Sequence, residues 1–271
     1  MSDATHEQRG ATGTAQTPRP ILEAREIVKT YGHVEALRGA NFTANAGEVV
    51  ALIGDNGAGK STLIKLLSGV AHPDGGEILF DGRPVHLGSP SEAQRLGIET
   101  VFQDLSLAPD LDGAANLYLG REQLRPGVLG KLGVLDKRAM REGAITAFGD
   151  LGVDIKDAAA TVAYLSGGQR QGVAVARAAA WANKVIIMDE PTAALGVVQS
   201  GRVLDVIRQV RDRGLTVILI SHNMPEVLAV ADRVEVLRLG RRVARFDRSD
   251  ATLESLVGAM TGALQFEEER A

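Results

Sequence analysis

The stretch from Gly54 to Ser61, which reads G-D-N-G-A-G-K-S, most narrows what this chain can fold into. It fits the phosphate-binding pattern G-x-x-x-x-G-K-[S/T]. An unbroken apolar run precedes it at 49–53, as is typical of a strand buried on both faces, and an apolar helical stretch follows at 62–67. The glycines therefore lie between a strand end and a helix start, where backbone N–H groups converge on an anion at the positive end of the helix dipole.

Two side chains of this loop carry the predicted chemistry. Lys60 is expected to reach the β- and γ-phosphates of a nucleotide, and the Ser61 hydroxyl is expected to hold Mg²⁺. A glycine-rich turn that matches the pattern by chance is the alternative, which the order of strand, loop and helix disfavours. The other predicted contacts to the nucleotide are Gly54, Asp55, Asn56, Gly57, Ala58, Gly59 and Thr62.

The composition is that of an ordinary globular protein, with 45% hydrophobic and 24% charged residues among 271. The net charge of −4 argues against nucleic acid as the main partner, because no basic surplus is present to neutralise phosphates. The absence of cysteine excludes disulfides and thiolate metal sites. No apolar run approaches the roughly 18 residues of a membrane-spanning helix, and we find no secretory signal. We expect a cytoplasmic protein that contacts a membrane only through a partner.

The pattern along the chain indicates an α/β fold. Residues 1–20 are polar and predict a disordered leader. Further strands are predicted at 98–102, 185–188 and 215–220, with helical stretches between them, which favours a mainly parallel sheet with right-handed crossovers. A helix is expected around 201–213, and a C-terminal helix from 250 to about 262.

A helical insert is predicted from about residue 104 to residue 164. β-branched runs vanish there, and Ala, Leu, Arg and Glu dominate. Leu117, Leu119 and Leu124 are expected on one piece of this insert. Met140, Ala144, Phe148 and Leu151 recur at helical spacing on another.

Polar residues follow several predicted strands, and ligands of parallel sheets bind beyond the carboxyl ends of the strands. Asp189 is predicted to face Mg²⁺, and the adjacent Glu190 to orient or deprotonate an attacking water. His222 either hydrogen-bonds a γ-phosphate, holds the glutamate in place or is structural. Gln103 can ligate Mg²⁺ through its amide oxygen. Tyr31 either stacks on a purine or packs within a hairpin.

A second anion cradle is predicted where Leu165-Ser166-Gly167-Gly168-Gln169 precedes an Ala-rich helix. The same dipole argument applies to it as to the first loop. The alternative is an N-cap serine followed by flexible glycines. Two phosphate cradles for one nucleotide are odd, unless the second serves the nucleotide of another subunit.

These motifs together resemble those of the ATP-binding subunits of ABC transporters. The order is G-D-N-G-A-G-K-S, V-F-Q, L-S-G-G-Q, V-I-I-M-D-E-P and S-H-N, and the resemblance covers about residues 21–262. The motif L-S-G-G-Q distinguishes this family from other P-loop families, because they lack it. The resemblance implies a P-loop NTPase with a RecA-like core, an antiparallel β subdomain and a helical subdomain at about 104–164. The ATP-binding domain would span 21–265, with a tail at 266–271.

The resemblance also implies a role for each site residue. Tyr31 would stack on adenine, and Gln103 would bind Mg²⁺ and sense the membrane partner. Asp189 would belong to the metal shell, Glu190 would be the general base and His222 the γ-phosphate switch. Two subunits would pair head to tail, so that each ATP lies between the P-loop residues Lys60 and Ser61 of one copy and the signature motif of the other, Ser166, Gly167, Gly168 and Gln169.

One segment departs from the family pattern. After Pro191-Thr192 the family usually has S-A-L-D, whereas this chain has A-A-L-G, ending at Gly196. The usual aspartate helps couple the two sites of the dimer, so this coupling is in doubt here. The variant A-A-L-G-V, together with A-A-N-L-Y-L-G-R-E at 114–122, is similar to the branch that serves monosaccharide importers. One ATPase unit is present, so we expect a homodimer.

The resemblance thus implies an ATPase, with ATP and Mg²⁺ as cofactors, that energises a sugar importer from the cytoplasmic face of the membrane. Its expected partners are a second copy, membrane permease subunits and, indirectly, an extracytoplasmic solute-binding protein. One alternative is a soluble ABC-type ATPase of DNA repair or translation, which would carry long coiled coils or two ATPase units. A P-loop kinase is the other, and it would need no L-S-G-G-Q.

Overall fold

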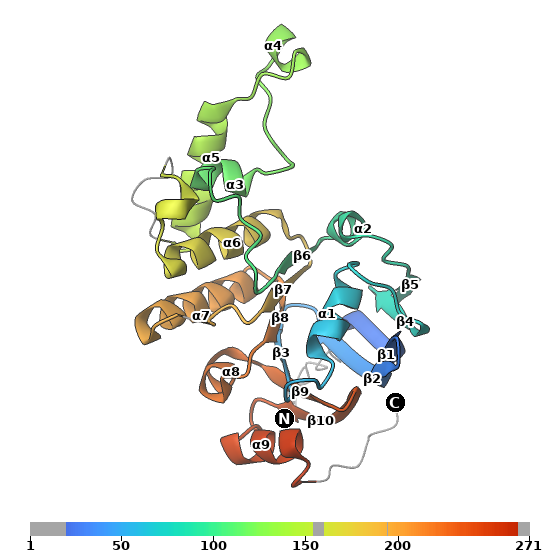
Figure 1. The fold of residues 1–271 in the computed structure, drawn as a ribbon. Coiled ribbons are helices and arrows are strands. Elements are labelled where there is room, and N and C mark those ends of the chain that lie inside the picture. The colour runs from blue at the N-terminus through green and yellow to red at the C-terminus, as the bar shows by residue number, and fades with distance from the viewer. Residues whose placement is uncertain (1–19, 154–159, 194, 265–271) are drawn as a thin grey trace, which may run out of the picture.

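The computed structural model of this chain describes residues 20–153, 160–193 and 195–264 (Figure 1). Its central sheet has the strand order β10-β9-β3-β8-β7-β6. The strands from β9 to β6 are parallel to their neighbours, and β10 is antiparallel. The predicted mainly parallel sheet is confirmed. The bounds are β3 (Val49–Ile53), β6 (Ile98–Val101), β7 (Val185–Asp189), β8 (Thr216–Ile220), β9 (Arg233–Arg238) and β10 (Arg241–Asp247).

A second, antiparallel sheet lies beside this core, in the order β2-β1-β4-β5. Its strands are β1 (Pro20–Tyr31), β2 (Val34–Asn45), β4 (Gly75–Phe80) and β5 (Arg83–Val85). The predicted antiparallel β subdomain is therefore present. Pro20, taken as the last residue of the leader, is the first residue of β1. The rest of the leader and the tail at 266–271 lie outside the described residues.

Both faces of the central sheet are covered, which explains why its strands read as continuous apolar runs. In β8, Val217 and Leu219 join the core under α6 (Gly167–Trp181) and α7 (Val197–Asp212). The alternate residues Ile218 and Ile220 join the core under α1 (Lys60–Leu67). A third cluster packs α8 (Met224–Val230) and α9 (Leu253–Thr261) against β9. The short α2 (Pro90–Arg95) precedes β6.

The helical subdomain projects from the sheet, with α4 at its far end (Figure 1). It contains α3 (Gly113–Leu117), α4 (Val128–Lys131), α5 (Lys137–Asp150) and the 3-10 turn η1 (Val162–Tyr164). Asn116 is fully buried; its side chain accepts from the N–H of Ala108 at 2.8 Å and donates to the Ala108 carbonyl at 3.0 Å. This one side chain therefore fixes the entry into the subdomain.

Three of our expectations about helices were wrong. Leu117, Leu119 and Leu124 do not share one piece, because α3 ends at Leu117 and the other two side chains are exposed. α7 begins at Val197 rather than near Gly201. α9 begins at Leu253 rather than Asp250, because Thr252 and Ser255 form a capping box there. Among the described helices, none is both long enough and apolar enough to cross a membrane.

Candidate nucleotide site

Strand register brings the predicted polar segments to one edge of the central sheet. Ile220, the last residue of β8, pairs with Leu52 of β3 and with Asp189 of β7. Met188 of β7 pairs in turn with Val101, the last residue of β6. The chain segments that follow these four strands therefore emerge side by side. They carry the phosphate loop, Asp189-Glu190, His222 and Gln103.

The phosphate loop requires glycine at two positions that contact the rest of the core. A Cβ on Gly54 would lie 2.2 Å from the carbonyl oxygen of Leu237. A Cβ on Gly59 would lie 2.7 Å from the carbonyl oxygen of Ala36, and Gly59 has a φ of +106°. Larger residues would force the backbone away from this path. The glycines thus set the loop shape on which α1 begins.

The loop also presents hydrogen-bond donors that the protein itself does not use. Within the described part of the chain, the backbone N–H groups of Gly57, Gly59, Lys60 and Ser61 meet no acceptor. They lie at the N-terminus of α1, where the helix dipole favours an anion. Donors of this kind fit the oxygens of a phosphate chain.

Lys60 is buried, with 9% of its surface exposed, and lies among acceptors. Its ammonium donates to the carbonyl oxygens of Gly54, at 2.7 Å, and Asp55, at 3.0 Å. Burial lowers the pKa of Lys60, and the negative charges of Glu190 and Asp189 oppose this shift. The predicted proximity of Lys60 to the carboxylates after β7 is therefore present in the fold.

The two carboxylates at the end of β7, Asp189 and Glu190, differ in their surroundings. Burial raises the pKa of Asp189, as does the negative charge of Glu190, while the charges of Lys60 and Lys65 lower it. A nearby cation, such as a bound Mg²⁺, stabilises the charged form of such a carboxylate. Asp189 therefore presents a partly buried carboxylate whose charge a nearby cation would stabilise.

Glu190 is held by backbone and side-chain contacts. It adopts a left-handed conformation with a φ of +49°, and its N–H donates to the carbonyl oxygen of Ile220 at 2.9 Å. One carboxylate oxygen lies 3.0 Å from Nδ1 of His222. The His222 side chain is 68% exposed, and that of Glu190 is 23% exposed. Of the roles considered for His222, the structure shows the contact that holds the glutamate.

The remaining predicted ligands lie on the surface around this centre. Ser61 is exposed on the first turn of α1, and Gln103 is exposed just after β6. Tyr31 ends β1 with 47% of its surface exposed, and Nζ of Lys29 lies 5.5 Å from its ring centroid. Asn56 is also exposed within the loop. All four side chains are thus accessible to a ligand.

Two residues that sequence reasoning missed tie the site to its surroundings. Thr192 donates to Glu226 of α8 at 2.5 Å, which anchors the segment that follows Glu190. Arg177 of α6 donates to the carbonyl oxygens of Leu105, at 3.1 Å, and Ser106, at 2.9 Å, in the loop after Gln103. A hydroxyl two residues after Glu190 was a signal for the first. The Arg177 contacts could not be predicted from the sequence, because their partners are backbone carbonyl oxygens.

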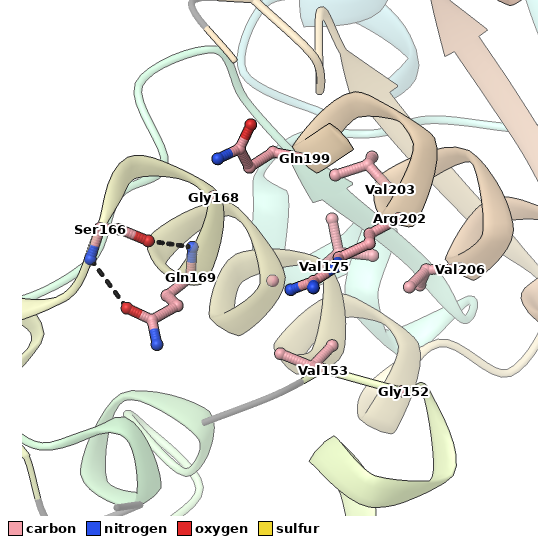
Figure 2. A pocket seen from close by; sticks show the side chains of 11 residues that line it. Gly152, Val153, Ser166, Gly168, Gln169, Val175, Gln199, Arg202, Val203 and Val206 are labelled. Carbon is pink, nitrogen blue, oxygen red and sulfur yellow. Dashed lines mark hydrogen bonds between the residues drawn. The ribbon is translucent and has the colours of Figure 1, made fainter. Parts of the chain in front are cut away.

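The signature motif begins α6 away from the phosphate loop. Ser166 and Gln169 cap the helix reciprocally: Ser166 Oγ accepts from the N–H of Gln169 at 3.3 Å, and the Gln169 side chain accepts from the N–H of Ser166 at 3.0 Å. Figure 2 shows this pair beside a cavity of about 230 Å³, whose far wall carries Gln199 and Arg202 of α7. Ser166 is therefore an N-cap, while the anion cradle stays a prediction; Ser166 and Gly167 are also exposed.

The chain matches the ABC transporter family over residues 37–193. It is 54% identical over 246 residues to the fructose import ATP-binding protein FrcA of Rhizobium meliloti, which covers 90% of this chain and 95% of the relative. It is 45% identical over 241 residues to the xylose/arabinose import ATP-binding protein XylG of Sulfolobus acidocaldarius, which covers 89% and 94%.

Solved structures agree with this match. A nucleotide-free ATP-binding cassette from an ABC transporter superposes with a TM-score of 0.75 at 27% identity, over 89% of this chain and 98% of that chain. A dimeric cassette in a post-hydrolysis state, bound to ADP and Pi, gives a TM-score of 0.71 at 25% identity, over 84% and 98%.

The chain therefore belongs to the ABC transporter family, as an ATP-binding subunit whose ATPase activity is coupled to transport. The predicted P-loop NTPase fold is confirmed, and so is the monosaccharide-importer branch. A coupling subunit, rather than a soluble ATPase, is the supported class. Nucleotide is its ligand, and it works with permease components.

Proposed function

We propose that this chain hydrolyses MgATP at the edge of its central sheet and thereby powers import of a monosaccharide through a membrane permease. The observation that carries the proposal is the convergence of Lys60, Asp189, Glu190 and His222 at neighbouring strand ends. The sugar importers named among the relatives support the substrate class.

Binding of the triphosphate would use the loop and the first turn of α1. The unused N–H groups would bind phosphate oxygens, and the Lys60 ammonium would turn from the loop carbonyls to the β- and γ-phosphates. Ser61, Gln103 and Asp189 would hold Mg²⁺, which neutralises phosphate charge when bound. Hydroxyl, amide and carboxylate oxygens are the donors that Mg²⁺ prefers. The exposed ring of Tyr31 would stack on adenine.

Hydrolysis would use the Glu190–His222 pair. Glu190 would take a proton from the attacking water, a contribution of roughly 10²–10⁴-fold in rate. His222 orients that carboxylate through Nδ1, which leaves its Nε2 for the γ-phosphate. In this proposal Glu190 is the base because His222 holds its carboxylate, and Asp189, at the end of β7, is left to bind the metal.

A second copy would complete each site. Ser166, Gly167, Gly168 and Gln169 begin α6 on the surface of the single chain, so a head-to-tail homodimer would present them to the partner's γ-phosphate. The dimeric cassette among the similar structures supports a dimer. Gly196 is the N-cap of α7 and adds no capping side chain where the family usually has aspartate. Coupling across the dimer would therefore rest on other contacts.

Transmission to the permease would pass through the helical subdomain. Arg177 joins α6, which the signature motif begins, to the loop that follows Gln103. A movement of the signature helix would thus move the segment that senses the permease. We place the subunit at the cytoplasmic face of the membrane, where an extracytoplasmic solute-binding protein would act on it only through the permease.

The test is Glu190→Gln, which keeps the shape of the side chain but removes the base. We expect ATP binding to persist, steady-state hydrolysis to fall by more than about 100-fold, and a closed dimer to accumulate with ATP in size-exclusion chromatography. The matched control is Glu142→Gln, an exposed carboxylate on α5 that pairs with Arg138. Undiminished hydrolysis in Glu190→Gln would contradict the base assignment.

A further inference from the structure

The far end of the helical subdomain is a hairpin-like projection, residues 123–136, which we call the tip. Its two arms are joined where the N–H of Arg125 donates to the carbonyl oxygen of Val134, at 2.9 Å, and the N–H of Asp136 donates to that of Gln123, at 2.7 Å. A Cβ on Gly130 would lie 2.0 Å from the carbonyl oxygen of Arg125, so glycine is required for this close approach. The tip is therefore a formed structure held by its own backbone.

The tip exposes apolar side chains that a folded domain normally buries. Val128 is 72% exposed and Leu132 is 74% exposed, and α4 has no buried residue at all. A contiguous exposed apolar patch marks an interaction site or a membrane contact. Figure 1 shows α4 at the end of the subdomain farthest from the sheet. The other exposed apolar residues of the tip are Leu124, Leu129, Val134 and Leu135.

The charges around this patch are predominantly positive. The tip and the adjacent Lys137 contain three basic residues and one acidic residue, which gives +2 in a chain whose net charge is −4. Arg121 and Arg138, just outside the tip, are paired with Glu99 and Glu142. Arg125, Lys131 and Lys137 are exposed. Asp136, the one acid, is used as the N-cap of α5 and accepts from the N–H of Ala139 at 3.1 Å. Apolar side chains within a basic rim are the chemistry of a segment that binds anionic lipid.

We propose that the tip docks directly on an anionic membrane surface. Val128, Leu129 and Leu132 would enter the headgroup–acyl boundary, and Arg125, Lys131 and Lys137 would bind lipid phosphates. The contact needs neither ATP nor permease, so it goes beyond the proposed function and beyond our expectation of membrane contact through a partner alone. In a dimer, two tips would bind one surface with added avidity.

A second exposed apolar face serves as the internal comparison. On α9, Leu253 is 53% exposed and Val257 is 44% exposed. Asp250 and Glu254 lie beside them, so this face repels anionic lipid. Both places expose apolar side chains, more of them at the tip, and the charge beside them differs in sign. Membrane binding should therefore use the tip and spare α9.

The first experiment is co-sedimentation of the purified full chain with vesicles. We expect binding to vesicles of phosphatidylcholine with phosphatidylglycerol, weak binding to phosphatidylcholine alone, and release in high salt. Lys131→Glu/Lys137→Glu should weaken binding by at least about fivefold per charge, and Val128→Asn/Leu132→Asn should abolish it. Leu253→Asn is the control and should bind normally. ATP hydrolysis of the tip variants should stay unchanged, which shows that they fold.

The second experiment locates the contact. The chain has no cysteine, so Leu132→Cys and Leu253→Cys each provide a single site for an environment-sensitive fluorophore. Anionic vesicles should shift the emission to the blue at position 132 and not at 253. Absence of vesicle binding, equal binding by the tip variants, or a blue shift at position 132 that requires the permease protein would overturn the proposal.

Discussion

The edge of the central sheet and the helical subdomain are built from different elements and serve different roles. The sheet edge is built from buried parallel strands whose register brings Lys60, Asp189 and Glu190 together. The helical subdomain is built from short helices around one buried amide, Asn116, and ends in an exposed apolar tip. The predicted catalytic residues thus lie where the backbone is most constrained. The projecting helical subdomain, which has its own small core, is the part proposed to contact neighbouring molecules. Substitutions in one of these regions should therefore leave the properties of the other unchanged.

Lys60→Ala should give the largest effect and should be confined to the sheet edge. It removes the buried cation that lies near Asp189 and Glu190. We expect nucleotide affinity to fall by at least about 100-fold, because a charge-assisted contact to phosphate is lost. Titration with a fluorescent ATP analogue measures this. Lys184→Ala, at the exposed opposite end of β7, is the control. Retained micromolar affinity would refute the phosphate role.

Glu235→Gln should test how the core sheet is joined to the antiparallel sheet. Glu235 is fully buried and pairs with Arg233, whose guanidinium also contacts Glu48 at 2.5 Å and the carbonyl oxygen of Thr43 in β2. Glu235→Gln leaves Arg233 with one carboxylate partner, Glu48, and takes the partner from Arg242 and Arg245. Burial raises the pKa of Glu235, which offsets part of the cost of removing its charge, so we expect a loss of about 2 kcal/mol in the free energy of unfolding. Urea denaturation measures it, with exposed Glu254→Gln as the control. An unchanged free energy of unfolding would show that Glu48 alone is a sufficient partner for Arg233.

Asn116→Ala should weaken the helical subdomain and leave the sheet edge intact. It deletes the side chain that binds both backbone groups of Ala108 and leaves the half-buried Ala108 N–H without its acceptor, while the Ala108 carbonyl keeps the N–H of Leu111. We expect a loss of about 2 kcal/mol, seen as faster hydrogen exchange in α3 and α5, at unchanged ATP affinity. If ATP affinity fell in parallel, the two regions would not be separable.

Asp189→Asn should have the smallest effect on stability, and its sign depends on pH. Burial raises the pKa of Asp189, so the folded chain holds this proton more tightly than the unfolded chain does. The folded state therefore loses stability as pH rises through that pKa, and the charged carboxylate is a cost at neutral pH. We expect Asp189→Asn to raise Tm by about 2 °C at pH 7, with a smaller difference in acid. A lowered Tm at pH 7 would contradict this; Mg²⁺-dependent hydrolysis should be lost.

The same contrast explains what the sequence could predict. Each strand-end residue follows a continuous apolar run, and a parallel sheet fixes where such ends meet. Gly54–Ser61 and Asp189 were therefore placed correctly in the fold. The sequence predicts a loop at Pro126-Gly127 and Gly130 to Gly133 and a helical piece that includes Leu124. The exposure of the tip's apolar side chains was not foreseen, because the pattern carries no sign of it. Arg233 and Glu235 were also missed, since their charges lie within a strand of otherwise apolar residues. The roles of the individual ligands remain predictions until the variants are measured.

The capping box of α6 has a thermodynamic consequence for how two copies separate. In the single chain, the N–H groups of Ser166 and Gln169 are already bonded within the motif. A phosphate that takes either donor exchanges one hydrogen bond for another, so the net gain is far smaller than for an unsatisfied donor. In the proposed head-to-tail dimer, these two donors would therefore add little to closure around ATP. After loss of the γ-phosphate the helix start would satisfy itself again, so these donors would oppose separation of the subunits only weakly.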